Sequence, residues 1–220
     1  MVKFDIITIF PEIFNSYLTE SLIARAQKKK LIKINVHNLR KWTRDRHKTV
    51  DDRPFGGGLG MVIKIEPIYR AVQSLKSKIK SQKSKIILFT PRGEKFNQKI
   101  AYQLSKLDQL IFICGRYEGV DERVAKHIAD VGLSIGDYVL MGGELPAIVV
   151  IETVARLIPG VLSKKELLKE RITREKGFIE YPQYTRPEVF NNWRTPKILL
   201  SGNHKKIEEW RKKHGKVIEK

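Results

Sequence analysis

The 220 residues include one cysteine, no long apolar run and comparatively few acidic side chains. The lone thiol, Cys114, cannot close an internal disulfide, which fits a reducing cytoplasm. No apolar stretch reaches the roughly 20 residues that a membrane span needs, and the first residues, MVKFDII, carry an acid where a signal peptide is apolar. The five histidines are scattered, without an HExxH motif or a Cys/His cluster, so we expect no structural zinc site. These absences predict a cytoplasmic globular protein without a membrane segment.

Positive charge is present in excess. The chain carries 43 lysines and arginines against 24 aspartates and glutamates, a formal net charge of +19. This excess favours polyanions as partners, and nucleic acid is the leading candidate. Residues 40–48 place Trp42 among five lysines and arginines, and we expect phosphate contacts there. The alternative is a lysine-rich composition in which these side chains only solvate the surface.

The most informative segment is the run DDRPFGGGLGM at residues 51–61. Two acids and an arginine lead through a proline into four glycines within five positions. Glycine costs backbone entropy, so such a cluster is typical of a backbone that adopts positive φ or approaches a ligand closely. We interpret the run as a loop that receives a phosphate or a base, and a flexible surface loop is the alternative. It lacks the Gly-Lys-Ser/Thr of a P-loop and the GxGxxG of a dinucleotide site.

Apolar and polar segments alternate in a way that predicts an α/β fold. Buried strands are expected at residues 2–10, 31–39, 85–89 and 109–114, and helices at 13–26, 66–79, 97–107 and 145–158. This alternation indicates a mostly parallel sheet with helices on both faces. In such sheets ligands bind beyond the carboxyl ends of the strands. Three glycine-containing segments, at residues 90–93, 115–119 and 134–143, each follow an apolar strand and could together form one pocket.

The composition changes after the most apolar helix, at residues 145–158. That helix is apolar all round, which indicates burial within the protein or against another subunit. Pro159 and Gly160 end it, and a charged segment follows. We therefore predict a cofactor-binding domain at residues 1–160, a flexible linker at 161–176 and a small helical domain at 177–220. The last domain carries a basic amphipathic helix at about residues 204–216.

Three motifs together resemble one family closely. They are GRYEGVDERV at residues 115–124, SIGDYVLMGGEL at 134–145 and VDDRPFGGGLGM at 50–61. The sequence resembles the bacterial tRNA (guanine(37)-N(1))-methyltransferases, which belong to the SPOUT class of S-adenosylmethionine-dependent enzymes. FPE at residues 10–12, YTRPE at 184–188 and LSGNH at 200–204 extend the match over nearly the whole chain.

The resemblance implies a fold and a set of ligand-binding residues. The sheet domain would end in a deep trefoil knot, which sequence rules could not predict because knots are nearly absent from proteins. The cofactor would be held in the knot by Leu88, Phe89, Pro91, Gly115, Tyr117, Glu118, Ile135, Gly136, Tyr138, Leu140, Gly142, Gly143 and Pro146. The tRNA would be bound by Asp52, Arg53, Gly57, Gly58, Tyr184, Arg186 and Asn203. The enzyme would be a homodimer with each active site between two chains.

The implied reaction moves a methyl group to N1 of the guanine 3′ of the anticodon. Because N1 holds a proton near neutral pH, a base must remove it, and a cation should stabilise the charge that develops on O6. Arg156 matches the family's arginine for the second task, and an interface ion pair is the alternative. The family's catalytic aspartate has no counterpart here, since counting back from Gly177 reaches Arg171 and Ile172. Glu170 is the predicted base, with Glu175 the other nearby carboxylate, although both could be surface residues.

A second function is compatible with the same features. An RNA-binding protein of this fold could keep the cofactor knot and have weakened or lost catalysis, and the carboxylate near Gly177 discriminates between the two. A related enzyme acting on ribosomal RNA is disfavoured by the DDRP and YTRP segments. Magnesium is a further cofactor that the resemblance implies, without a ligand set in the sequence. A short segment after the basic helix would lower the affinity for tRNA relative to typical family members.

Overall fold

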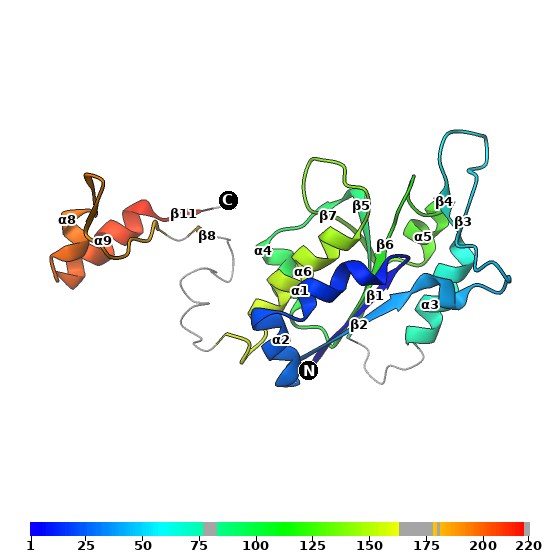
Figure 1. Cartoon of the computed structure of the whole chain (residues 1–220), viewed down its shortest axis with the longest axis horizontal. Coiled ribbons are helices and arrows are strands. Elements are labelled where there is room, and N and C mark those ends of the chain that lie inside the picture. Colours follow the sequence, from blue (N-terminus) through cyan, green and yellow to red (C-terminus); the bar gives the residue numbers. More distant parts are fainter. Residues whose placement is uncertain (77–82, 163–177, 180, 218–220) are drawn as a thin grey trace. The chain divides into compact units, whose positions relative to one another are not determined.

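The computed structural model describes residues 1–76, 83–162, 178–179 and 181–217 (Figure 1). The chain separates into two compact units, Met1–Ser163 and Lys164–Lys220, and each is described by itself. The domain boundaries that the sequence predicts near residues 160 and 176 stay predictions, because residues 163–177 lie outside the described part. In the described ranges no helix is long and apolar enough to cross a membrane.

The first unit is built around a sheet of five parallel strands. The strands are β1 (Val2–Thr8), β2 (Ile32–Asn38), β5 (Ser84–Lys95), β6 (Gln109–Cys114) and β7 (Val131–Ser134). Their order across the sheet is β2-β1-β6-β5-β7, and every neighbouring pair is parallel. The mostly parallel α/β fold that the sequence predicts is therefore confirmed.

Helices cover both faces of this sheet (Figure 1). The helical segments are η1 (Pro11–Phe14), α1 (Asn15–Leu18), α2 (Ser21–Lys28), η2 (Leu39–Trp42), α3 (Ile65–Lys76), α4 (Gln98–Leu104), α5 (Glu122–His127) and α6 (Glu144–Leu157). On β5, Ile87 and Phe89 pack into a core with α2, α4 and α6, whereas Ile86 and Leu88 pack into a second core with α3 and α5. Since successive strand residues point to opposite faces, the unbroken apolar run of β5 fills both cores.

Strand β5 is longer than the predicted segment at residues 85–89. Phe89 and Glu94 both pair with Leu133 of β7, so residues 90–93 leave the line of the strand and return to it. Pro91 lies in this excursion, and it has no N–H with which to continue the strand ladder. The excursion places residues 90–93 beyond the sheet edge, where they can contact a ligand.

The first predicted helix is divided into shorter pieces. The sequence pattern predicts one helix at residues 13–26, but η1, α1 and α2 take its place. The hydroxyl of Thr19 donates one hydrogen bond that is shared between the carbonyl oxygens of Asn15 (2.8 Å) and Ser16 (3.0 Å). Threonine side chains that bond in this way satisfy the last carbonyls of a turn and help to end it.

The apolar character of α6 is explained mostly within its own unit. Ala147, Val150, Ile151 and Val154 are fully buried against the sheet and α4. Only Leu145 and Val149, on the opposite side of the helix, are apolar and exposed, at 57% and 40%. The helix therefore leaves a narrow apolar stripe for any partner, rather than the fully apolar surface that its composition indicates.

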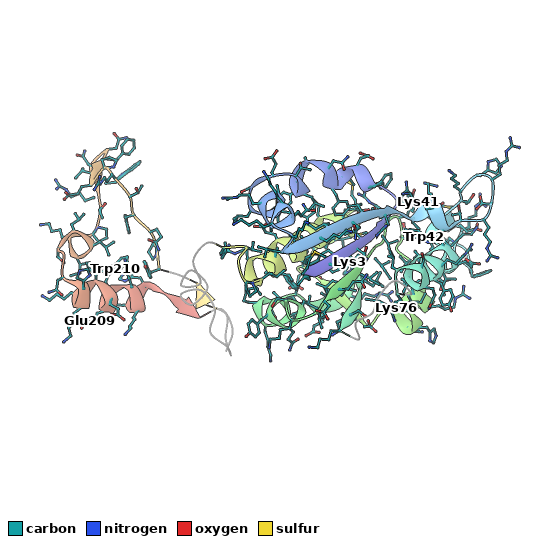
Figure 2. The ribbon with its side chains drawn as sticks, turned by 90° about the horizontal axis from the view of Figure 1, so that it is seen from below. Lys3, Lys41, Trp42, Lys76, Glu209 and Trp210 are labelled. Atoms are coloured by element: carbon teal, nitrogen blue, oxygen red, sulfur yellow. The ribbon has the colours of Figure 1, made fainter. Side chains whose placement is uncertain are left out.

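The second unit contains short elements. Strands β8 (Phe178–Ile179) and β11 (Lys216–Val217) pair antiparallel, as do β9 (Val189–Phe190) and β10 (Trp193–Arg194), and α8 (Lys197–Leu200) and α9 (His204–His214) complete the unit. Trp210 of α9 lies against the rings of Tyr181, Tyr184 and His214. Figure 2 labels Glu209 and Trp210 on α9, and as consecutive helical residues they differ in direction by about 100°. One tryptophan thus centres the packing of this unit.

Candidate active site

A cavity of about 690 Å³ lies at the carboxyl ends of β5, β6 and β7. Its walls come from residues 88–94, 115–120, 132–135 and 138–143, together with residues of α5 and of the first turn of α6. Ligand pockets of proteins commonly have volumes of about 300–1,000 Å³. The cavity lies at the edge of the sheet where parallel α/β proteins bind ligands.

The structure gathers the predicted cofactor residues in this one place. All of them except Gly136 line the cavity. Those that do are Leu88, Phe89, Pro91, Gly115, Tyr117, Glu118, Ile135, Tyr138, Leu140, Gly142, Gly143 and Pro146. Gly136 instead lies against the ring of Tyr138, which itself lines the cavity. The wall is largely apolar, with glycines where the backbone itself is exposed to a ligand.

A buried ion pair joins two walls of the cavity. Arg116 Nε donates to Glu144 Oε2 at 2.9 Å, and the Thr8 hydroxyl donates to Glu144 Oε1 at 2.7 Å. Glu144 is 1% exposed, and a buried carboxylate needs a partner for its charge. Arg116 supplies the opposite charge, and each carboxylate oxygen accepts one hydrogen bond. A backbone hydrogen bond joins the same two loops, since Gly143 N donates to Gly115 O at 3.0 Å. The end of β1, the loop after β6 and the start of α6 are thereby fixed to one another.

Sequence reasoning quoted Arg116 and Glu144 as parts of motifs but gave neither a role. The signal that could have found them is an arginine in one glycine-flanked loop together with an acid directly after the Gly-Gly pair of the other. A Cβ at Gly142 would lie 2.5 Å from Arg116 Nε and 2.6 Å from Glu144 Oε2. Gly142 therefore has no side chain because the ion pair occupies that space.

Two surface ion pairs tether the rim of the cavity. Arg92 contacts Glu122 at 2.6 Å, and Lys95 contacts Asp137 at 2.5 Å. All four side chains are substantially exposed, so each pair contributes little to stability. Their effect is to restrain the 90–93 excursion and the loop before α6 relative to neighbouring elements.

Cys114, the last residue of β6, directly precedes the cavity-lining Gly115 and is 3% exposed. Burial raises the pKa of its thiol well above the usual range, the Glu144 carboxylate raises it further, and Arg116 partly opposes them. The thiol is therefore protonated near neutral pH, and a protonated thiol is a poor nucleophile.

The glycine-rich run forms the tip of a small hairpin. Strands β3 (Asp51–Asp52) and β4 (Val62–Ile63) pair antiparallel, and the loop between them projects from the unit (Figure 1). Met61 O accepts from Glu118 N, and Gly119 O accepts from Ile63 N, both at 3.0 Å. The base of the hairpin is thus bonded to the loop that lines the cavity.

The predicted substrate residues of this hairpin lie outside the cavity wall. Asp52 contacts Lys64 at 3.5 Å, and the backbone N–H of Arg53, followed by Lys64, lowers the pKa of the Asp52 carboxyl. Arg53, Gly57 and Gly58 lie in the projecting loop, where the neighbouring Phe55 is fully exposed. The loop is accessible to a large ligand such as a nucleic acid.

The basic segment at residues 40–48 lies next to the hairpin in sequence. Arg40 donates from its guanidinium to Lys48 O at 2.9 Å, which closes the segment into a loop. Figure 2 places Lys41 and Trp42 next to each other on this segment. The Trp42 ring meets His37 edge-on, with centroids 5.8 Å apart. The lysines and arginines of this segment are therefore carried on a loop that is held in place by the Arg40–Lys48 hydrogen bond and by the contact of Trp42 with His37.

The remaining predicted substrate residues lie in the second unit. Tyr184 packs against Trp210, with ring centroids 6.4 Å apart. The Asn203 side chain accepts from Lys206 N at 3.1 Å and caps α9. Arg186 is exposed. Tyr184 and Asn203 thus have clear structural roles, and Arg186 is free to contact a ligand.

The predicted catalytic residues do not meet in the described part of the chain. Arg156 lies in the last turn of α6, half-buried, and it does not line the cavity. Glu170 and its alternative Glu175 lie outside the described residues. Among residues 1–76, 83–162, 178–179 and 181–217, no group of three or more histidines, cysteines, aspartates or glutamates could hold a metal ion.

The parallel sheet and the cavity at its carboxyl edge define an α/β protein with a ligand-sized cavity between three strand-end loops. A model of the family described as tRNA (Guanine-1)-methyltransferase TrmD matches residues 2–218. The chain belongs to this family, and it is therefore an enzyme of the tRNA methyltransferase class.

Individual relatives agree over most of the chain. A protein of Dictyoglomus turgidum is 54% identical over 213 residues, which cover 97% of this chain and 84% of the relative. A protein of Clostridioides difficile is 46% identical over 219 residues, covering 100% of this chain and 94% of the relative. Both carry the name tRNA (guanine-N(1)-)-methyltransferase.

Proposed function

We propose that this chain transfers a methyl group from S-adenosylmethionine to N1 of guanine 37, the nucleotide 3′ of the anticodon in tRNA. The observation that carries the proposal is the cavity at the carboxyl edge, because its walls are the three glycine-containing segments that follow β5, β6 and β7. The family membership supports the same chemistry.

The residues of the cavity fit S-adenosylmethionine. Leu88, Leu140 and Pro146 provide apolar surface for a purine, and the exposed backbone of the glycine-containing loops can bond its edge. Glu118 and Glu122 provide carboxylates for the ribose hydroxyls or for a cationic group. When bound, the cofactor supplies a methyl group activated by a positively charged sulfur. The protein's part is to hold this group in place and to exclude water.

The family's trefoil knot is part of the same proposal. In support, the chain passes through the 90–93 excursion, returns to pair with β7, and then brings residues 142–143 against residues 115–116. These contacts bring together the loops among which the knot of the proposal would form.

A homodimer would complete the active site. Arg156 lies twelve residues beyond Glu144 on α6, which is about 18 Å along the helix. Arg156 does not line the cavity of its own chain. In a dimer, Arg156 of one chain could reach the cavity of the other.

The exposed apolar surface supports the dimer. Phe10 and Tyr17 are each 42% exposed, and Leu145 and Val149 form the apolar stripe on α6. Tyr17 donates to Glu152 of α6 at 2.9 Å, so α1 and α6 present one continuous surface. Exposed apolar patches of this kind are typical of protein interfaces.

The proton of guanine N1 needs an acceptor, and we propose Glu170 for this role. Arg156 would stabilise the negative charge that develops on O6, since a preorganised cation lowers the energy of such a transition state. Magnesium stays an expectation from the family, and no step is assigned to it. The second unit, with its basic helix α9, would bind tRNA as the chain's small C-terminal domain, in the cytoplasm.

The test is incubation with labelled S-adenosylmethionine and unmodified tRNA, followed by mapping of the methylated base. We expect one labelled N1-methylguanine at position 37. Methylation at another base would overturn the assignment of the substrate. Tight tRNA and cofactor binding without methylation would favour the RNA-binding alternative.

A further inference from the structure

The glycine-rich hairpin meets the wall of the cofactor cavity along a short contact that includes Gly60 and Glu118. A Cβ built on Gly60 would lie 2.6 Å from Glu118 Oε1 and 2.8 Å from Glu118 Cγ. Both distances are shorter than any relaxed carbon contact, so a side chain at residue 60 would need the space that Glu118 occupies. Glu118 in turn lines the cavity.

The backbones at this point are held together. Glu118 N donates to Met61 O at 3.0 Å, directly beside Gly60. The Glu118 side chain is exposed and has no hydrogen-bond or ion-pair partner among the described residues. Its direction is therefore set by the space available, and Gly60 forms one side of that space. Because both Cγ and Oε1 are crowded, a methyl group at residue 60 would turn the whole side chain rather than its tip.

We infer that Gly60 is a positioning residue, whose missing side chain allows the Glu118 carboxylate to lie at the cavity wall. The glycine-rich hairpin and the cofactor cavity then share a wall, so the hairpin's position sets the charge that faces the cofactor. The inference rests on the proposed function, because S-adenosylmethionine is the ligand whose hydroxyls and positive charges that carboxylate would meet.

The chain contains a matched control for the backbone. Gly60 has φ +82° and Gly56 has φ +84°, so alanine is strained to a similar degree at each. A Cβ at Gly56 would meet nothing within 4 Å. Gly60→Ala and Gly56→Ala therefore share the backbone cost and differ in the contact with Glu118.

The experiment is calorimetric titration of the full-length protein with S-adenosylmethionine in the absence of tRNA, together with thermal unfolding. We expect both variants to lower the melting temperature equally. Gly60→Ala should weaken cofactor binding by about ten-fold or more, because hydrogen bonds to a charged group are lost, and Gly56→Ala should bind like the wild type. In steady-state assays, the loss in Gly60→Ala should appear in the KM for the cofactor more than in kcat.

A second comparison isolates Glu118. In the Glu118→Ala background the crowded atoms are absent, so adding Gly60→Ala should weaken cofactor binding no further than adding Gly56→Ala. Equal affinities of Gly60→Ala and Gly56→Ala, or an undiminished effect of Gly60→Ala in the Glu118→Ala background, would overturn the inference. If the wild type does not bind S-adenosylmethionine, the proposed function and the inference fail together, whereas the first two outcomes remove the inference alone.

Discussion

Arg116 and Glu144 are 28 positions apart in the chain, and their side chains form an ion pair of 2.9 Å at the wall of the cavity. Glu144 also accepts from Thr8 at the end of β1. Arg116 lies 4.9 Å from the centre of the exposed Phe10 ring, a cation–π contact. The pair thus connects the cavity wall, the sheet and the apolar surface proposed as the dimer interface.

Removing one member of this pair should destabilise the first unit. Arg116→Met leaves the Glu144 carboxylate buried without its cation, and breaking a buried pair in this way costs about 3–5 kcal/mol. Urea unfolding followed by far-ultraviolet circular dichroism measures the free energy of unfolding. The control is Arg92→Met, which removes an exposed pair and should change it by less than about 1 kcal/mol. Equal effects of the two variants would contradict the assignment.

Acid should weaken the protein through Asp5. This carboxylate is fully buried in β1 and is bonded by His37, Lys3, Asn35 and Gln109. Burial alone would raise its pKa, but the hydrogen bonds, led by that of His37, outweigh burial and lower the pKa from 3.8 to about 2. The folded-state pKa is thus below the unfolded value, so this stabilisation is present above pH 3.8 and is lost as pH falls through about 2.

The size of the Asp5 effect follows from the shift, which corresponds to about 2 kcal/mol. We expect the free energy of unfolding to fall by that amount between pH 4 and pH 2, beyond the decline seen in Asp5→Asn. Denaturant titrations at several pH values measure the difference. If the free energy of unfolding falls equally with pH in the wild type and in Asp5→Asn over this range, the Asp5 carboxylate is not the cause of the acid sensitivity.

The stripe on α6 predicts a dimer that a single charge disrupts. Val149→Asp places a carboxylate in the proposed interface, where burial without a partner is costly. Sedimentation at micromolar concentration should show a dimer for the wild type and a monomer for the variant. Tyr69→Asp, on α3 at the other face of the sheet, is the control, since Tyr69 is 52% exposed and outside the stripe. A monomeric wild type would remove both the dimer and the shared active site.

Two matched substitutions test the proposed general base, Glu170. Glu170→Gln should lower the rate of single-turnover methylation by about 10²–10⁴, the usual contribution of a positioned base, and leave cofactor binding unchanged. Glu175→Gln should have little effect. The reverse result would show that the alignment to the family's aspartate is shifted. If neither substitution matters in an active enzyme, the proton has another acceptor.

Much of the fold could be predicted because its signals are local. The apolar runs at Ile86–Phe89 and Leu110–Cys114 indicate strands buried on both faces, and helices of the right spacing flank them. The motif loops that follow these strands then fall at one edge of a parallel sheet, which is why the cavity residues could be named in advance. The broken first helix was missed because Thr19 ends α1 through side-chain bonds that hydrophobic spacing does not reveal.

The sequence by itself determined the alternation of strands and helices, the excess of positive charge and the three motifs that mark the family, since each depends on residues near one another in the chain. Only the tertiary structure decided which distant groups meet. Asp5 and Gln109 are 104 positions apart, Thr8 and Glu144 are 136 apart, and Glu118 lies against Gly60. Such contacts depend on strand order, register and close packing of the whole unit, and no local periodicity encodes them.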